Sequence, residues 1–312
     1  MAEKEKKSKK KCTYIGGQAV LEGVMMMGKT AMATAVRDPD GEIQVEAKRL
    51  KRGKHLSRAC KIPFVRGIIN LVLSLVRGTK ILMRSAAVYG DSEEEAGRIQ
   101  KWLAEKFKVN LMDVIAVISA CLGVILAIGI FVFLPRFVVG LIPRIGEDHW
   151  AYYVLLGVFK LIIFIAYLAL VLLLKDIRRL YMYHGAEHKT INAYEYGVEL
   201  TPEKVAECSR LHDRCGTSFL FIVLFINIVI ISAANWAVFT YVPVIKDVQN
   251  GVLRFLINIA IELVLLPLIA GFSYEILKFL AKFDNKFINI FKAPGKLIQK
   301  TLTTREPDLA MI

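Results

Sequence analysis

The sequence lacks the features of a small, secreted, disulfide-bonded protein. Its cysteines are odd in number, five among 312 residues, and their spacings match no disulfide framework. The first residues, MAEKEKKSKKK, are charged and are not followed by the apolar segment of a signal peptide, so we expect no cleaved signal. We therefore expect reduced thiols at Cys12, Cys60, Cys121, Cys208 and Cys215.

Acidic residues are also scarce, because 28 Asp and Glu stand against 42 Lys and Arg, a formal net charge of +14. No nucleic-acid-binding motif accompanies this charge, and the basic residues flank apolar segments, so we expect no nucleic-acid partner. Anionic lipid headgroups are the partner that this pattern favours. The sequence has no P-loop or Rossmann pattern. Membrane protein partners and the oligomeric state are left open.

Long apolar runs, in contrast, are plentiful. Hydrophobic residues make up 55% of the chain, which is high for a soluble domain. Four runs exceed the roughly 20 residues that a spanning helix needs. We predict an all-α polytopic membrane protein whose four transmembrane helices cover residues 111–134, 151–174, 218–240 and 251–274.

A fifth apolar segment, 62–84, has a different pattern. At about 100° per residue its polar side chains fall on one narrow face of a helix. A lipid-exposed span with four cations on one stripe would be costly, so this segment is predicted to be a basic interfacial or re-entrant helix. The polar stripe consists of Arg66, Asn70, Arg77, Lys80 and Arg84.

The charges beside the spans predict the topology. Lys and Arg are concentrated in segments 1–110, 175–217 and 275–312, whereas the loops 135–150 and 241–250 contain only three. Because positive residues gather on the cytoplasmic side, both termini and the loop 175–217 are predicted to be cytoplasmic. The protein is then a multi-pass protein of a cell membrane.

The N-terminal part is predicted to be a cytoplasmic module. Residues 1–12 form a lysine-rich tail, expected to be disordered. Residues 13–61 form a small β-containing module with candidate strands at 31–37 and 42–48. The intervening Asp38-Pro39-Asp40-Gly41 is a favourable turn sequence.

After the membrane domain, 111–274, the segment 275–312 is predicted to be amphipathic, basic and lying on the membrane surface. We expect it to continue the last span until Pro294-Gly295 ends the helix. Its lysines recur every four residues at Lys278, Lys282 and Lys286.

The loop after the second span carries the most specific chemical signal, an H-x-x-E-H sequence. His184 and His188 share a helix face and can bind one metal ion. Glu187 stands beside them as a candidate catalytic base, as in the inverted zincin pattern. The H-x-x-C pair His212 and Cys215 adds two ligands of types that Zn²⁺ accepts. We expect these residues to converge on a zinc site.

Two interpretations of this site remain open. Short H-x-x-E-H matches arise by chance, and interfacial histidines also bind headgroups or backbone carbonyls. Four protein ligands would make a structural metal site, and three would leave a position for catalysis, so the sequence leaves open whether the protein is an enzyme. Basic neighbours would ring the site and favour an anionic substrate, namely Arg178, Arg179, Lys189, Arg210 and Arg214.

A glycine-rich run at 16–28 is a second candidate binding segment, with Gln18 and Glu22 as its polar members. Glycines allow a close approach of the backbone, so such a loop can hold a phosphate headgroup. Tight turns of the β-containing module are the alternative explanation.

Two ionisable residues, Lys160 and Glu262, lie inside predicted spans. Such residues are functional candidates by default, and a structural ion pair is the alternative. Each lies about ten residues from the outer end of its span, so we expect them to pair near the bilayer midplane.

Four motifs resemble those of the YqhQ-like family of bacterial membrane proteins, a group of unknown function. They are GGQAVLEGVMM at 16–26, YHGAEHKTI at 183–191, RCGTSF at 214–219 and LTTREPD at 302–308. The resemblance covers nearly the whole chain and implies a bacterial cell membrane, but it implies no activity.

The leading hypothesis is a membrane protein with a cytoplasmic, headgroup-level His/Glu/Cys site that binds zinc and binds or acts on a lipid-linked or anionic substrate. A transporter or flippase that uses Lys160 and Glu262 is the first alternative. A non-catalytic membrane scaffold is the second.

Overall fold

The structure is a computed structural model that describes residues 13, 15–50, 58–89, 102, 106, 111–142, 149–246, 248, 250–280, 283 and 285–312. The predicted disordered tail, 1–12, lies outside the described residues. The chain divides into two compact units. The first unit comprises Met1–Tyr89, Leu168–Phe225 and Leu266–Ile312, and the second comprises Gly90–Tyr167 and Ile226–Leu265.

A four-stranded antiparallel sheet with the order β1-β2-β3-β4 forms the N-terminal part of the first unit. The strand predicted at 31–37 is confirmed, and the one predicted at 42–48 begins and ends one residue later. The strands are β1 Gly16–Val20, β2 Gly23–Met27, β3 Ala31–Arg37 and β4 Ile43–Arg49.

The glycine-rich run forms the hairpin β1–β2, in which Gly16 pairs with Met27 and Val20 with Gly23. It is therefore a paired hairpin and not an open phosphate-binding loop, because its backbone groups bond across the two strands. Glu22 makes the turn with a φ of 50°.

Helix α2, Val65–Tyr89, packs on this sheet and contributes Ile81 to its apolar core, with Val20, Met25 and Val36. The hydroxyl of Ser85, 1% exposed, accepts a hydrogen bond from the Leu21 N–H (3.2 Å). These contacts make α2 part of the first unit over its whole length.

Four of the five residues of the polar stripe predicted on α2 contact protein partners, and Lys80 is exposed. Its guanidinium and amide groups contact Glu275, Tyr274, Met27 and Glu46. Elsewhere on the helix, large apolar side chains are exposed, at Val72, Leu75 and Val76.

Four helical segments among the described residues are long and apolar enough to cross a membrane, in agreement with the predicted number: Val117–Gly140, Trp150–Val171, Leu220–Tyr241 and Gly251–Leu280. The first and last extend six residues beyond the predicted ends. In the first, Pro135 lies early in a new helical segment, where its missing N–H is tolerated, so the helix continues past the expected boundary.

Several helices build these segments. Helix α4 Leu111–Ile128, the π-helical turn η2 Gly129–Phe133 and α5 Leu134–Gly140 form the first, and α6 Trp150–Val171 forms the second. The third lies in α9 Gly216–Tyr241, which is followed by α10 Pro243–Lys246, and the fourth is α11 Gly251–Leu280.

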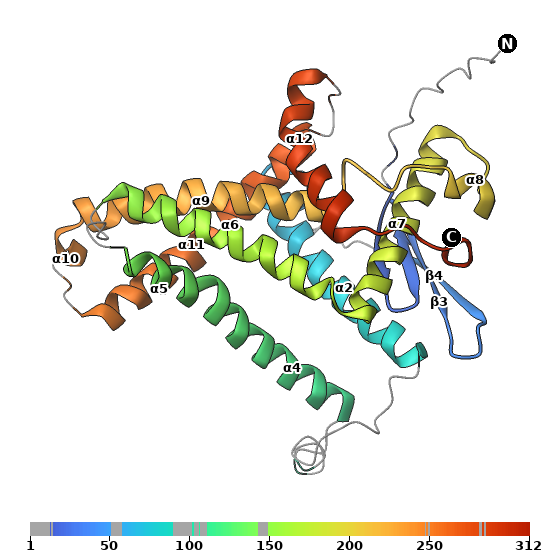
Figure 1. The fold of residues 1–312 in the computed structure, drawn as a ribbon, viewed down its shortest axis with the longest axis horizontal. Coiled ribbons are helices and arrows are strands. Elements are labelled where there is room, and N and C mark those ends of the chain that lie inside the picture. The colour runs from blue at the N-terminus through green and yellow to red at the C-terminus, as the bar shows by residue number, and fades with distance from the viewer. Residues whose placement is uncertain are drawn as a thin grey trace. The chain divides into compact units, whose positions relative to one another are not determined.

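The remaining elements belong to the first unit. Helix α7 packs against β1 and β2, and the C-terminal turn η4 contacts α7 and α8 (Figure 1). Their bounds are α7 Lys175–Tyr196, α8 Pro202–Ala206, α12 Lys286–Ile298, the π-helical turn η3 Gln299–Thr303 and η4 Leu309–Met311.

The predicted end of the C-terminal helix is wrong. Helix α12 begins after Asn285, whose side chain accepts a hydrogen bond from the Ile288 N–H (2.8 Å), and it runs through Pro294. Burial of Gly295 and Ile298 offsets the hydrogen bond that the proline removes.

Candidate metal site

Helix α7 carries the H-x-x-E-H sequence and stacks its two histidines one turn apart. The ring centroids of His184 and His188 are 4.4 Å apart. The helix ends at Gly197, which adopts the left-handed conformation (φ 69°). The local sequence therefore places both imidazoles on one face, as predicted.

Cys215 completes a group of three residues whose side chains can bind a metal ion. It immediately precedes α9, and its Sγ lies 3.2 Å from His184 Nε2. The possible ligand atoms of His184, His188 and Cys215 all lie within 4.8 Å of one another. His188 is 1% exposed and Cys215 is 6% exposed, whereas His184 is partly exposed.

Hydrogen bonds to the backbone orient both rings. His184 Nδ1 lies 2.7 Å from the Thr303 carbonyl oxygen, and His188 Nδ1 lies 2.7 Å from that of Arg210. A carbonyl only accepts, so each Nδ1 carries a proton, and Nε2 is the ring nitrogen left to offer a lone pair to a metal. Burial lowers the pKa of His188, which favours its neutral form. This is the arrangement that second-shell partners impose on metal-binding histidines.

Glu187 is held between α7 and the sheet. It is 4% exposed, and burial raises the pKa of its carboxyl group to about 7. A Cβ atom on Gly17 of β1 would lie 2.7 Å from its Oε1, so glycine leaves the space for this carboxylate. Glu187 is not one of the three grouped ligands.

His212 is not among the three residues whose possible ligand atoms lie within 4.8 Å of one another. Its ring centroid is 5.7 Å from that of His188, but its Nε2 faces Glu195 Oε2 at 3.5 Å. The side chain of Gln299 holds the backbone of His212 with two hydrogen bonds, of 3.0 and 2.9 Å. His212 was expected to bind the metal, and in the structure its Nε2 lies beside the buried carboxylate of Glu195.

Glu195 is a buried residue beside the site that the sequence did not indicate. It is completely buried and accepts from Thr13 N (3.1 Å), Thr13 Oγ1 (2.7 Å) and Arg214 Nη2. Burial alone would raise its pKa, but the bonds from His212, Thr13 and Arg214 hold the pKa far below its usual range. The available signal was its position seven residues after His188, on the same helix face.

Four of the five basic residues that were expected to ring the site form ion pairs within the protein. Lys189 Nζ donates to the Ala206 carbonyl oxygen and pairs with Glu306, each at 2.5 Å. Arg210 donates to the Thr304 carbonyl oxygen at 2.7 Å, and Arg214 pairs with Glu195. Arg179 pairs with Glu22, whereas Arg178 is exposed. A buried cation next to a carboxylate is compensated internally.

Gln18 and Glu22, the predicted polar members of the glycine-rich run, join the hairpin to neighbouring helices. Gln18 Nε2 lies 3.5 Å from the Gly78 carbonyl oxygen in α2. Glu22 pairs with Arg179 and accepts from the Tyr183 hydroxyl at 3.1 Å. The hydrogen bond to Arg179 is the main reason that the pKa of Glu22 is lowered.

The C-terminal segment packs beside the metal-ligand group of His184, His188 and Cys215. The sequence did not indicate this contact. In addition to the Thr303 contact, Arg305 N donates to the Tyr181 carbonyl oxygen at 2.9 Å. The Arg305 carbonyl oxygen lies directly over Gly185, where a Cβ atom would collide with it. Gly185 therefore allows the segment to lie against α7 beside His184.

In the second unit, the predicted pair of Lys160 and Glu262 is present, at 2.9 Å. Arg136 donates to the same carboxylate oxygen at 3.0 Å. The adjacent cavity is lined by Lys160, Asn235 and Glu262 among others and has a volume of about 10 Å³. A cavity of that size holds about one water molecule.

Sequence comparison relates this chain to known proteins. It is 32% identical over 293 residues to the uncharacterized protein YqhQ of Bacillus subtilis (strain 168), covering 94% of this chain and 86% of that protein. No solved structure matches. Residues 62–312 match the family described as a protein of unknown function, DUF1385, and the chain belongs to that family.

Proposed function

We propose that this chain is a membrane protein that binds zinc through His184, His188 and Cys215 and uses the site to bind or transform a lipid-linked or anionic substrate at headgroup level. One observation carries the proposal. Both Nδ1 atoms donate to backbone carbonyls, so both Nε2 lone pairs are available beside the Cys215 sulfur. Two imidazoles and a thiolate are ligands that Zn²⁺ prefers.

The number of ligands supports a reactive site. Three protein ligands leave one tetrahedral position for a water molecule or a substrate, as in catalytic zinc sites. Glu187 stands directly before His188 in the H-x-x-E-H order and is our candidate for the general base. Because the surrounding cations are ion-paired, the metal position itself is the better candidate for contact with an anionic group.

Membrane insertion is part of the proposal. Four apolar helices and the concentration of Lys and Arg in the segments 1–110, 175–217 and 275–312 support a cell-membrane protein with cytoplasmic termini. The exposed apolar side chains of α2 support its placement in the lipid interface, with its polar stripe turned to protein.

The two alternatives differ in their support. A transporter that uses Lys160 and Glu262 needs a substrate cavity, and the cavity beside this pair holds about one water molecule. The bonds of Lys160 and Arg136 to the same carboxylate oxygen of Glu262 support a structural role instead. The scaffold alternative predicts that the protein binds no metal.

Metal analysis of the purified full-length protein tests the proposal. We expect about one zinc ion per chain, as in three-ligand sites. We expect zinc to be lost from His188→Ala and Cys215→Ser. His149→Ala and Cys208→Ser change the same residue types outside the group and should keep it.

Cobalt substitution adds a readout of ligation. A cobalt–thiolate absorption band should appear in the wild type and disappear in Cys215→Ser. Glu187→Gln should retain the metal, because Glu187 lies outside the ligand group. A wild-type protein that takes up no zinc or cobalt, or a Cys215→Ser variant that retains both, would contradict the proposal and favour the scaffold.

A further inference from the structure

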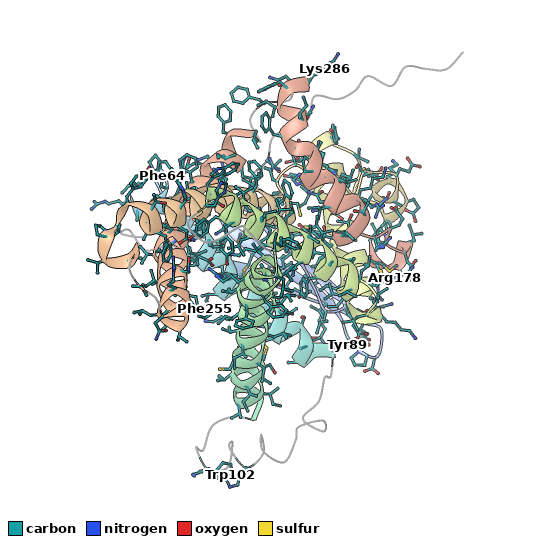
Figure 2. All side chains as sticks on the ribbon, turned by 60° about the vertical axis from the view of Figure 1, so that its left-hand side comes forward. Phe64, Tyr89, Trp102, Arg178, Phe255 and Lys286 are labelled. Carbon is teal, nitrogen blue, oxygen red and sulfur yellow. The ribbon has the colours of Figure 1, made fainter. Side chains whose placement is uncertain are left out.

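A second site lies in the first unit, where the start of α2 meets the C-terminal part of α11. It is a groove with a volume of about 440 Å³. Phe64 lies there at the molecular surface (Figure 2) and is 41% exposed. Three aromatic and three charged side chains dominate its lining, namely Phe64, Phe272, Phe279, Arg66, Glu275 and Lys278.

The charges in this groove do not cancel. Arg66 donates to both carboxylate oxygens of Glu275, from Nε at 2.6 Å and also from Nη2. Lys278 is exposed and forms no ion pair with any residue that the structure describes. Two cations and one carboxylate therefore leave one positive charge at the groove, with guanidinium and ammonium groups that suit a phosphate.

The rest of the groove is apolar and exposed. Phe272 is 44% exposed and Phe279 is 55% exposed, and the rings of Phe64 and Phe272 lie 5.6 Å apart. Exposed aromatic side chains next to cations are typical of the membrane interface, where a ring can contact acyl chains.

The backbone at this point is strained. Phe64 has a φ of 64°, a conformation that side chains other than glycine rarely adopt. Its N–H donates to Glu275 Oε1 at 3.3 Å, and Gly271 packs so closely that a Cβ there would lie 2.9 Å from the Phe64 carbonyl oxygen. Surrounding contacts thus hold Phe64 in a costly conformation, which is a feature of ligand-binding sites.

Given the membrane insertion proposed above, the length of α11 indicates where the groove lies relative to the bilayer. Its 30 residues span about 45 Å, whereas the hydrocarbon core of a bilayer is about 30 Å thick. If Gly251 marks one edge of the core, about 20 residues cross it. Phe272, Glu275 and Lys278 then lie in the headgroup layer.

We propose that this groove binds an anionic phospholipid. Lys278 contacts the phosphate, while Arg66 stays paired with Glu275. Phe272 and Phe279 contact the first part of an acyl chain. The site is independent of the metal ligands, and its occupant is selected by one negative charge combined with an apolar tail. This inference depends on the membrane insertion proposed above and not on zinc.

Binding measurements on the full-length protein in detergent test it. The probes are short-chain phosphatidylglycerol, phosphatidylcholine with the same chains, and inorganic phosphate, each followed by native mass spectrometry. We expect Lys278→Gln to weaken phosphatidylglycerol binding about fivefold, the effect of one cation near a lipid surface. Lys286→Gln, at an exposed lysine of α12, should leave it unchanged.

Two further variants separate charge from shape. Glu275→Gln releases Arg66 for the phosphate and should strengthen phosphatidylglycerol binding. Phe64→Gly keeps the positive φ without strain and removes only the ring, so it should weaken lipid binding while the thermal midpoint does not fall.

The outcomes are distinct. Equal binding of phosphatidylglycerol and phosphatidylcholine, unchanged binding by Lys278→Gln, or competition by inorganic phosphate at the same concentration as the lipid would overturn the inference. Zinc content in Lys278→Gln and flotation of the wild type with liposomes report separately on the metal site and on membrane insertion.

Discussion

In the second unit one carboxylate, that of Glu262, is shared by Lys160 and Arg136, whereas in the first unit His184, His188 and Cys215 meet through two ring nitrogens and a thiol. In the Glu262 network, the carboxylate and the two cations neutralise one another, so these charges are satisfied within the protein. The histidines direct their donors outward to carbonyls and their lone pairs inward. One cluster is thus complete without a ligand, and the other is arranged to accept a cation.

The two clusters also differ in what holds them. The Glu262 network joins residues of long apolar helices, where an uncompensated charge is expensive. The metal-ligand group is closed by an irregular C-terminal segment that donates from Arg305 and accepts at Thr303. We expect the stability of the Glu262 network to depend mainly on its charges. We expect the metal-ligand group to depend mainly on the close packing of the C-terminal segment.

The largest effect is expected at Glu262. Glu262→Gln leaves Lys160 and Arg136 without their shared anion, which should reduce the free energy of unfolding by about 3–5 kcal/mol. Lys160→Met should cost less, because Arg136 still pairs with Glu262. Denaturant titration in detergent measures both.

The double variant Lys160→Met with Glu262→Gln serves as the control for this network. Removing one cation together with the carboxylate should make it more stable than Glu262→Gln alone. If Lys160→Met costs as much as Glu262→Gln, the carboxylate is not the centre of the network.

The next effect tests shape in the first unit. Gly185→Ala places a methyl group against the Arg305 carbonyl oxygen, and this overpacking should cost about 1–3 kcal/mol. The displaced C-terminal segment should also release His184 from Thr303 and lower the zinc content. Thermal unfolding and metal analysis measure the two consequences.

Gly16→Ala is the matched control for Gly185→Ala, because a Cβ at Gly16 meets no atom within 4 Å. It should retain both stability and metal. Full zinc content in Gly185→Ala would show that the C-terminal segment does not position the ligands.

Glu195 predicts a pH dependence of the first unit. Its folded pKa lies below the unfolded value of about 4.3, because Thr13, His212 and Arg214 hold the ionised form. The carboxylate therefore stabilises the fold above about pH 4.3, and this stabilisation is lost as the pH falls toward the folded pKa.

Glu195→Gln should lower the stability at neutral pH by about 1–3 kcal/mol, because buried donors lose their partner. The variant should also lose less stability than the wild type on acidification, as followed by the thermal midpoint. Glu199→Gln removes an exposed carboxylate that pairs with Lys204 and should change little. Parallel acid profiles for the wild type and Glu195→Gln would contradict the assignment.

The smallest effect tests shape in the second unit. Gly157→Ala directs a methyl group at the side chain of Ile228, whose Cγ2 would lie 2.3 Å from the new Cβ and must shift. The gain in helix propensity, about 1 kcal/mol, should offset part of this overpacking, so the net loss should stay below about 2 kcal/mol. Gly123→Ala, where a Cβ meets nothing within 4 Å, should be stabilising. A large loss in Gly157→Ala would show that packing controls this unit as strongly as charge.

Local sequence determined the elements of this protein. Apolar length predicted four membrane-capable helices, and the Asp38-Pro39-Asp40-Gly41 turn predicted the hairpin between β3 and β4. The four-residue spacing of His184 and His188 predicted their shared face. These features depend on residues close together in the chain, so periodicity and turn chemistry are sufficient to find them.

Only the tertiary structure decided which groups meet. Thr303 orients His184 although the two residues are 119 positions apart, and Glu195 lies beside His212, which was expected to bind the metal. Likewise, only the structure shows that four of the five basic residues expected around the site are ion-paired, since a charge reveals its sign in the sequence but not its partner. Long-range contacts depend on how the chain packs, and neither spacing nor composition specifies that.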